Sequence, residues 1–486
     1  MDLRYFQKTD CDGISRCVDV DAAPIRVVGN ESILKALDHK ALQQANAVAK
    51  HTPGVYDVTL TPDAHPGVGC PIGCVATSQT HVYPGVIGAD VNCSISLLQI
   101  DISADELKPI EVRRRLIEEI EKRVSASCGT NRAPKRRKFS LGDLRYALTC
   151  GLNRFTAERF GFDEAYLARF EDSSISYDKA ATSTLEKRLK EFEEARLLSY
   201  YAEQIGTYGG GNHFGECQRI SVVPEKAETA EAFGLIDGRV GFMSHCGSRG
   251  FGEKLALHTQ RRLIEKFEKW GIPFPADDQN LVYAPIDSQE AEDIYGDMAL
   301  ARNFALLNHA VINSLVAEAF QEVFPGVESN LIYCVSHNNA RYEVVDGRVM
   351  LVHRKGATRA YPANHFALRG TTFYETGTPI LLPGDPVGGS SVMVAEPGAE
   401  RSRFSVNHGA GRSVGRKDAK WMYRQEDVNA TLSEADVISN QKDYPVDEAP
   451  DVYKNFDDVL QSVVDAGLAS EVARLKALFV LKGASY

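Results

Sequence analysis

Residues 87–93 read IGADVNC, follow an apolar run at 82–87 and lead into SISLL at 94–98. This pattern is typical of a glycine-containing turn that enters a buried strand. The turn places a carboxylate, Asp90, three residues before a thiol, Cys93, and carboxylate with thiolate forms a metal-ligand pair. A lone cysteine beside a strand is more often a core residue, and aspartate often stabilises turns, so this segment alone leaves a structural role open.

Four of the twelve histidines lie in similar turns, where a short apolar segment ends in glycine or small polar residues: His213, His245, His337 and His408. One such histidine is usually a hydrogen-bonded structural residue. Four of them, together with Asp90 and Cys93, favour a shared site, because strand ends in α/β proteins converge on one face. Imidazole suits Mn, Fe, Co and Zn, a thiolate can bridge two metals, and a metal pair suits phosphoryl chemistry.

Two glycine-rich turns, at 384–391 and 409–412, predict a phosphate site, because their backbone N–H groups can face an anion. Neither is followed by GKS or GKT, which disfavours an ordinary P-loop enzyme. Arginines accompany these turns, including Arg249, Arg359 and Arg412. His309, in a predicted helix, and His353, followed by two basic residues, are interpreted as structural or surface residues.

The composition is that of a soluble globular protein: 486 residues, 43% hydrophobic, 25% charged, with a net charge of −11. Ten cysteines without a CxxC pair argue against a disulfide scaffold and suit a reducing compartment. The N-terminus is no signal peptide, and no run approaches the ~18 apolar residues of a membrane span. We therefore expect a cytoplasmic protein with no membrane partner.

The hydrophobic pattern predicts a mixed α/β (α+β) fold with a central β core surrounded by helices. We expect one domain over 1–486, with a helical insertion at about 102–205. Expected helices are 32–50, one opening at Ser103 with Glu106 as its capping box, 184–204, 252–269, 290–324 and 456–477. Expected strands lie within 55–99 and at 331–335, 348–353, 379–382 and 391–395.

A basic run at 135–138, close to Arg132, admits two interpretations. It is either a solvated loop or a loop that contacts a polyanion on an otherwise acidic protein.

At these motifs the sequence resembles the RtcB family of RNA-splicing ligases over nearly its whole length. The matching segments are PDAHPG at 62–67, PIG at 71–73, DVNC at 90–93, GNHF at 211–214, HCGSRG at 245–250, HRKGATR at 353–359, HGAGR at 408–412 and KG at 482–483. The resemblance implies a GTP- and manganese-dependent ligase that joins an RNA 3′-phosphate or 2′,3′-cyclic phosphate to a 5′-hydroxyl. It also implies an activating partner, archease, in some members.

In family terms His408 is the nucleophile that forms a histidine–GMP intermediate, Asp63 handles the RNA ends, and Arg249 contacts RNA or phosphate. Cys93, His213 and His245 would hold one manganese ion, and Cys93, Asp90 and His337 the other. Glu216 would accept from guanine and Phe214 would pack on the base. The other expected nucleotide-binding positions are Asn212, Asn338, Gly384, Ser390, Gly409, Ala410, Gly411, Tyr453 and Lys482.

The sequence departs from the family pattern at two positions. The nucleotide loop carries Asp385, which would repel a phosphate unless it is metal-bound or turned away, and Asn407 stands where many members have cysteine. Asp385 motivates a second hypothesis, a dinuclear metal phosphohydrolase that opens cyclic phosphates without ligation. A third hypothesis, non-catalytic RNA binding through 132–138, leaves the metal-ligand set unexplained.

Overall fold

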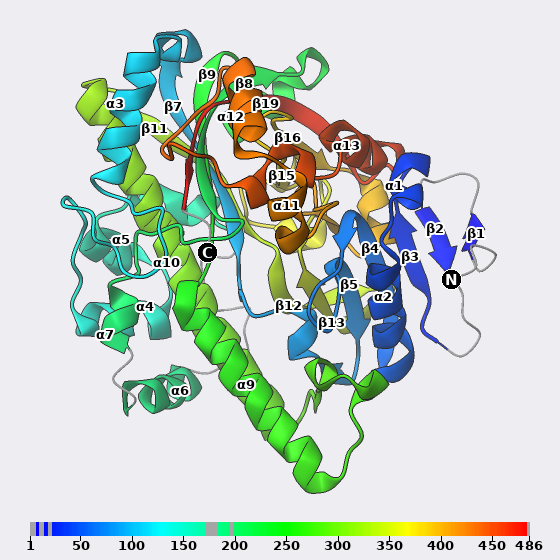
Figure 1. The fold of residues 1–486 in the computed structure, drawn as a ribbon. Coiled ribbons are helices and arrows are strands. Elements are labelled where there is room, and N and C mark those ends of the chain that lie inside the picture. The colour runs from blue at the N-terminus through cyan, green and yellow to red at the C-terminus, as the bar shows by residue number, and fades with distance from the viewer. Residues whose placement is uncertain (1–5, 9–13, 18–21, 172–181, 195–197, 484–486) are drawn as a thin grey trace.

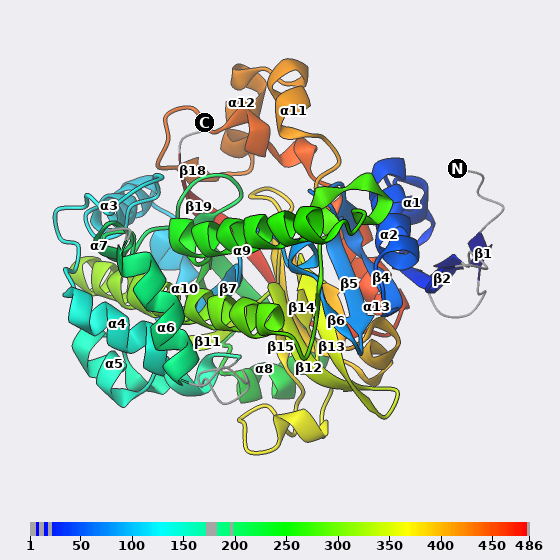
Figure 2. The same ribbon diagram turned by 90° about the horizontal axis from the view of Figure 1, so that it is seen from below.

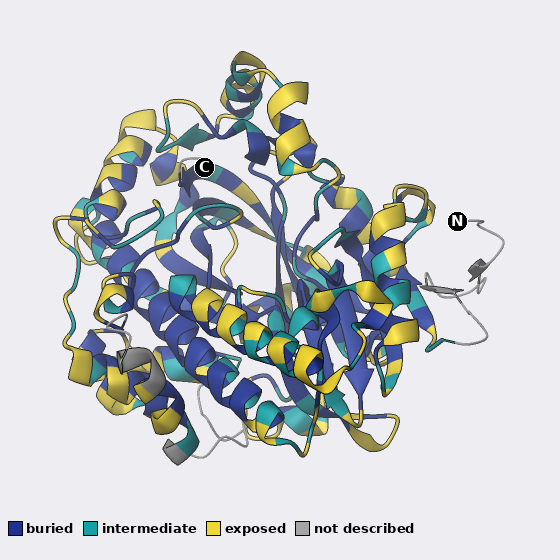
Figure 3. Ribbon diagram, turned by 60° about the horizontal axis from the view of Figure 1, so that its bottom comes forward, coloured by how far each residue is buried: buried dark blue, intermediate teal, exposed yellow. Residues whose placement is uncertain are grey.

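Two large β-sheets form the centre of the protein, and helices cover them (Figure 1). The structure is a computed structural model that describes residues 6–8, 14–17, 22–171, 182–194 and 198–483. This arrangement confirms the predicted mixed α/β class. Figure 3 shows buried strands in the interior and exposed residues on the outer faces of the helices.

The first sheet has seven strands, in the order β1 (Phe6–Lys8), β2 (Ile14–Cys17), β3 (Ile25–Val28), β4 (Val55–His65), β5 (Ile72–Ser78), β13 (Arg348–Lys355) and β12 (Asn338–Val345). The second has eight, in the order β11 (Ser329–Ser336), β7 (Ser94–Ser103), β9 (Arg239–Cys246), β8 (Phe214–Val222), β19 (Ala469–Lys482), β16 (Ser390–Ala395) and β15 (Pro379–Pro383), with β18 (Ile438–Ser439) beside β19. Two short pairs complete the set: β6 (His81–Val82) with β10 (Ala284–Pro285), and β14 (Ala357–Arg359) with β17 (Ser405–Asn407).

Two long helices, α9 (Arg249–Trp270) and α10 (Gln289–Val323), run side by side across the molecule (Figures 1 and 2). Both predicted helices are confirmed. Most residues of α10 are buried, including Phe304 and Phe320, so this helix is part of the core. Other helices outside the segment between β7 and β8 are α1 (Glu31–Lys35), α2 (His39–His51), α8 (Ala227–Phe233), α11 (Arg416–Met422), α12 (Gln425–Glu434) and α13 (Phe456–Asp465).

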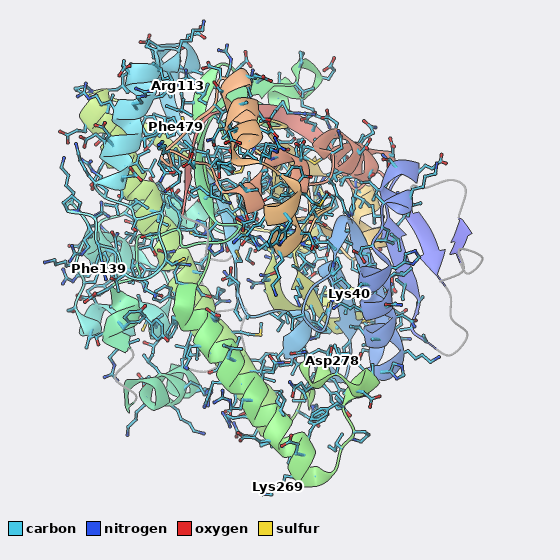
Figure 4. All side chains as sticks on the ribbon, in the orientation of Figure 1. Lys40, Arg113, Phe139, Lys269, Asp278 and Phe479 are labelled. Carbon is cyan, nitrogen blue, oxygen red and sulfur yellow. The ribbon has the colours of Figure 1, made fainter. Side chains whose placement is uncertain are left out.

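Between β7 and β8 the described chain is helical: α3 (Ile110–Glu121), α4 (Leu141–Cys150), α5 (Arg154–Phe160), α6 (Thr182–Glu194) and α7 (Leu198–Ala202). Helix α3 contacts the second sheet through Arg113, which donates to the carbonyl of Leu478 at 3.2 Å and lies near buried Phe479 (Figure 4). This helical segment therefore packs against the same core as the sheets.

Three boundary predictions are wrong. The helix expected over 456–477 ends at Asp465, and 469–482 forms β19, because Gly467 adopts a φ of +63° and the segment pairs with β8 and β16. The Ser103 side chain caps only a short 3₁₀ turn by accepting from the N–H of Asp105, and α3 begins after Pro109. The helix expected over 32–50 divides into α1 and α2, with Asp38 as the N-cap of the second.

Candidate functional site

The turn at 87–93 is confirmed as the entry to a buried strand, β7. It is tied to the start of β12: the N–H of Asn92 donates to the carbonyl of Asn338 at 2.7 Å, and the Asn338 side-chain amide donates to the carbonyl of Asp90 at 2.9 Å. Gly247 approaches this turn closely, since a Cβ there would lie 2.6 Å from Oδ1 of Asp90. Backbone contacts thus fix the turn before any ligand binds.

Strand register brings the predicted ligands to one edge of the second sheet. Ser94, the first residue of β7, pairs with Ser336 on β11 and with Cys246 on β9. Phe214, the first residue of β8, pairs with His245. Because these neighbours run antiparallel, the starts of β7 and β8 meet the ends of β9 and β11. The side chains gathered there are Cys93, His213, His245 and His337.

The tightest group consists of Cys93, His213 and His245, whose candidate ligand atoms all lie within 4.8 Å of one another. The Cys93 sulfur is 3.3 Å from Nε2 of His213 and 3.2 Å from Nε2 of His245. A carboxylate completes the surroundings, since Oδ2 of Asp90 lies 2.9 Å from Nε2 of His213. These are the donor types of a transition-metal site.

The ring of His337 lies between those of His245 and His408 in a chain of contacts. Its centroid is 5.1 Å from that of His245 and 4.6 Å from that of His408. Its Nδ1 and that of His213 are buried without a hydrogen-bond partner among the described residues. The other ring nitrogen of His213, Nε2, is the one that faces the thiol and the carboxylate, so an imidazole, a thiol and a carboxylate together offer a ligand set to a cation.

Protonation states agree with this interpretation. Burial lowers the pKa values of His245 and His337 well below the usual range of histidine, so both imidazoles are neutral. Burial, aided by the charge of Asp90, raises the pKa of the Cys93 thiol well above its usual value. A divalent cation would have to displace that proton, since the thiolate is the metal-binding form. The residues present therefore fit a metal ion.

His408 follows β17 and faces the same site, held by Asp63 of β4. Its Nδ1 donates to Oδ2 of Asp63 at 2.7 Å, and Thr61 donates to Oδ1 of the same carboxylate at 2.5 Å. Burial alone would raise the pKa of Asp63, but the bonds from His408 and Thr61 lower it, so the carboxylate stays ionised. Because the carboxylate accepts from Nδ1, the other ring nitrogen, Nε2, keeps its lone pair.

A pocket of about 370 Å³ joins these groups. Its lining contains most of the predicted residues: Asp90, Cys93, His245, His337, His408, Asn212, Phe214, Glu216, Asn338, Gly384, Gly409, Ala410, Gly411, Tyr453 and Lys482. Ser390 does not line the pocket, and its hydroxyl accepts a hydrogen bond from the side-chain amide of Gln218 at 3.0 Å. Arg249 and His213 line an adjoining groove that shares Asp90 and Asn212 with the pocket.

A family model described as tRNA-splicing ligase RtcB matches residues 44–483. The chain belongs to the RtcB family. Curated relatives carry the same description: one from Thermococcus kodakarensis is 33% identical over 95% of each chain, and one from Nanoarchaeum equitans is 33% identical over 95% of each chain. One from Archaeoglobus fulgidus is 32% identical over 93% of each chain.

The departure from the RtcB pattern at Asp385 has a local structural explanation. Oδ1 of Asp385 accepts from the N–H groups of Val387 at 2.9 Å and Gly388 at 2.8 Å. The carboxylate therefore stabilises the backbone turn that follows it. Burial raises the pKa of this carboxyl, and its hydrogen bonds from the two backbone N–H groups offset part of that rise. Asn407, the second departure, donates to the carbonyl of Gly409 at 2.8 Å and so braces the turn after His408.

Sequence reasoning missed Glu448, a buried carboxylate behind the pocket. It accepts from Lys482 at 2.7 Å and from the Tyr453 hydroxyl at 2.6 Å, and it also bonds Arg412 and Arg416. All four partners line the pocket of this RtcB family member. No local motif marks Glu448, since it lies in an ordinary acidic segment.

Lys454 was missed as well. Its ammonium group donates to the carbonyls of Pro62 at 2.9 Å and Ala64 at 2.7 Å, which flank Asp63. Burial lowers the pKa of Lys454 to about 8. The lysine thus fixes the backbone that carries the partner of His408.

The contacts of His309, of His353 and of the basic run bear on the roles predicted for them. His309 is buried and lies 3.2 Å from the sulfur of Cys246, and Nε2 of His353 accepts from the N–H of Tyr83 at 3.0 Å. Both are structural residues. In the basic run, Lys135 pairs with Glu119 and Glu322, and Arg137 pairs with Glu318. These ion pairs favour a structural role for the run.

No helix in the described part of the chain is long and apolar enough to cross a membrane.

Proposed function

We propose that this protein is an RNA ligase that joins RNA 3′-phosphate or 2′,3′-cyclic phosphate ends to 5′-hydroxyl ends, using GTP and manganese. Family membership supports the RNA ligase activity. The observation that carries the proposal is the position of His408, which shares one pocket with a thiol–imidazole cluster and is oriented by Asp63.

His408 acts as the nucleophile through Nε2. The lone pair of this nitrogen attacks the α-phosphate of GTP, a P–N bond forms, and pyrophosphate leaves. Asp63 holds the Nδ1 proton and stabilises the positive charge that develops on the ring. The GMP then passes to the RNA 3′-phosphate, and the 5′-hydroxyl attacks that phosphate and releases GMP. A 2′,3′-cyclic phosphate is first opened by hydrolysis.

Two manganese ions would be held by the residues at the strand edge. Cys93, His213 and His245 would bind one ion, and Cys93, Asp90 and His337 the other. When bound, the cations neutralise the charge of the triphosphate and polarise its α-phosphate. The positions of the glycine-rich turns at 384–391 and 409–411 support binding of the phosphates in the same pocket.

We predict that Asp63→Asn slows protein guanylylation by roughly 10²- to 10⁴-fold. The asparagine amide can donate to Nδ1, which would move the ring proton to Nε2 and remove the nucleophilic lone pair. Rapid-quench measurement with labelled GTP gives the rate. Thr61→Val is the control, since it removes one bond to Asp63 but leaves the carboxylate; an Asp63→Asn rate equal to the wild-type rate would exclude the orienting role.

A second prediction concerns guanine binding by Glu216. Burial, with a smaller contribution from the charge of Asp385, raises the pKa of Glu216 to about 7. The protonated carboxyl below that pH cannot accept both guanine N–H donors, whereas the carboxylate above it can. GTP affinity should therefore fall as the pH drops below about 7, approaching tenfold per pH unit. Calorimetric titration at several pH values measures this dependence. Glu216→Gln should abolish the change of GTP affinity with pH, and an unchanged pH dependence in this variant would assign it to another group.

Product analysis tests the proposed function against the phosphohydrolase alternative. RNA with a cyclic phosphate end and RNA with a 5′-hydroxyl end are incubated with manganese, with and without GTP. A ligase gives a joined product that depends on GTP. Opening of the cyclic phosphate without GTP and without joining would instead support the hydrolase. We also propose that archease is an activating partner and that the protein acts in the cytoplasm.

A further inference from the structure

The chain has two tryptophans, and one of them is almost fully exposed. Trp421 is 91% exposed near the end of α11, and its neighbour Met422 is 62% exposed. Figure 2 shows α11 and α12 standing out from the body of the protein. A large aromatic side chain in water brings no folding free energy, so its exposure points to a role in binding.

Other residues hold helix α11 against the protein, so the helix does not depend on packing of Trp421. Ala419 is fully buried in a cluster with Val428, Leu432 and Val452. The first residue of the helix, Arg416, bonds Asp447 at 3.1 Å and also Glu448. The helix therefore keeps its position without the tryptophan.

The segment around Trp421 differs in charge from the rest of the chain. Residues 416–424 carry four cationic side chains, Arg416, Lys417, Lys420 and Arg424, and one carboxylate, Asp418, in a protein with a net charge of −11. The next acidic residues in the sequence are Glu426 and Asp427, in the first turn of α12. Lys417 and Trp421 are four residues apart and thus share a helix face. Cations beside an exposed aromatic ring match a single-stranded nucleic acid, whose phosphates bind the cations while a base stacks on the ring.

The same helix leads to the candidate active site. Arg416 lines the pocket that holds His408, and Trp421 lies five residues further on, about 7.5 Å along the helix axis. A strand whose end reaches His408 can therefore pass over α11. A protein partner would also meet Met422, but the cations Lys417 and Arg424 on either side of Trp421 in the sequence favour RNA.

We propose that α11 is an RNA-binding platform, where Trp421 stacks on a base near the reacting end and the neighbouring cations contact phosphates. This inference rests on the proposed function for its substrate and adds the surface that receives the strand.

Fluorescence gives a direct test, because the second tryptophan serves as a matched control. Trp270 is 57% exposed at the far end of α9. The W270F protein keeps Trp421 as its single tryptophan, and the W421F protein keeps Trp270. An unstructured oligouridylate should quench the fluorescence of W270F, with the effect lost at high salt, and should leave W421F unchanged.

Kinetics provide the second measurement. W421A should raise the KM for RNA about tenfold, with little change in kcat, while W270A keeps the wild-type KM. The effect should be confined to the RNA-dependent step, with unchanged thermal midpoints for both variants. If RNA does not change the fluorescence of Trp421 and W421A keeps the wild-type KM for RNA, the proposal is wrong and a protein partner is the occupant of this surface. If RNA quenches Trp421 but the wild-type protein forms no GMP adduct, the ligase proposal fails and the RNA platform stands.

Discussion

His408→Ala should abolish formation of the protein–GMP adduct and all GTP-dependent joining of RNA. Removal of the nucleophile eliminates the P–N bond itself, so the loss should be on the order of 10⁴- to 10⁶-fold, as for other covalent catalysts. The variant should still fold, because His408 packs beside His337 and Asp63 at the rim of a pocket rather than in the core. Labelled GTP with gel analysis measures the adduct.

His365→Ala is the matched control for this substitution. His365 is a partly buried histidine that stacks on Tyr361, with ring centroids 4.2 Å apart, and it does not line the pocket. This control should keep the adduct. A His408→Ala protein that forms the adduct at the wild-type rate would show that another residue is the nucleophile.

Cys93→Ala should remove bound manganese and reduce guanylylation to background. The Cys93 sulfur lies 3.3 Å from Nε2 of His213 and 3.2 Å from Nε2 of His245, so its loss removes the thiol that both imidazoles contact. Without the cations, the charge of the triphosphate opposes its approach to His408. Elemental analysis of the purified protein and the labelled-GTP assay measure the two effects.

Cys334→Ala separates loss of a ligand from loss of packing. Cys334 is equally buried, on neighbouring strand β11, and belongs to the hydrophobic core. Both substitutions should cost about 1 kcal/mol of stability, but only Cys93→Ala should lose metal. If Cys93→Ala keeps manganese and still forms the adduct, Cys93 is a structural residue and not a metal ligand.

The sequence could indicate which residues gather at one place because these residues lie in short local motifs. The turn at 87–93, the strand end before His337, and the glycine-rich turns before His213 and after His408 each carry their own pattern. Convergence on one edge then follows from antiparallel pairing of adjacent strands. The metal-ligand group of Cys93, His213 and His245 is confirmed as a geometric cluster, although its metal stays a prediction.

Features that depend on long-range contacts could not be predicted. Residues 469–482 are rich in alanine, leucine and lysine, which favour a helix, but pairing with β8 and β16 overrides that propensity. Glu448 and Lys454 act on residues that are distant in the sequence, such as Arg412 and Pro62, and no local pattern marks them. The role of Asp385 in its own loop likewise requires the backbone geometry.

The site of guanylylation in the wild-type protein tests the role of His408 as the nucleophile. The protein is incubated with GTP and manganese, digested under alkaline conditions that preserve phosphoramidates, and analysed by mass spectrometry. We predict a single acid-labile GMP on the peptide that contains His408. A GMP on a lysine, such as Lys482, or the absence of any adduct would contradict it.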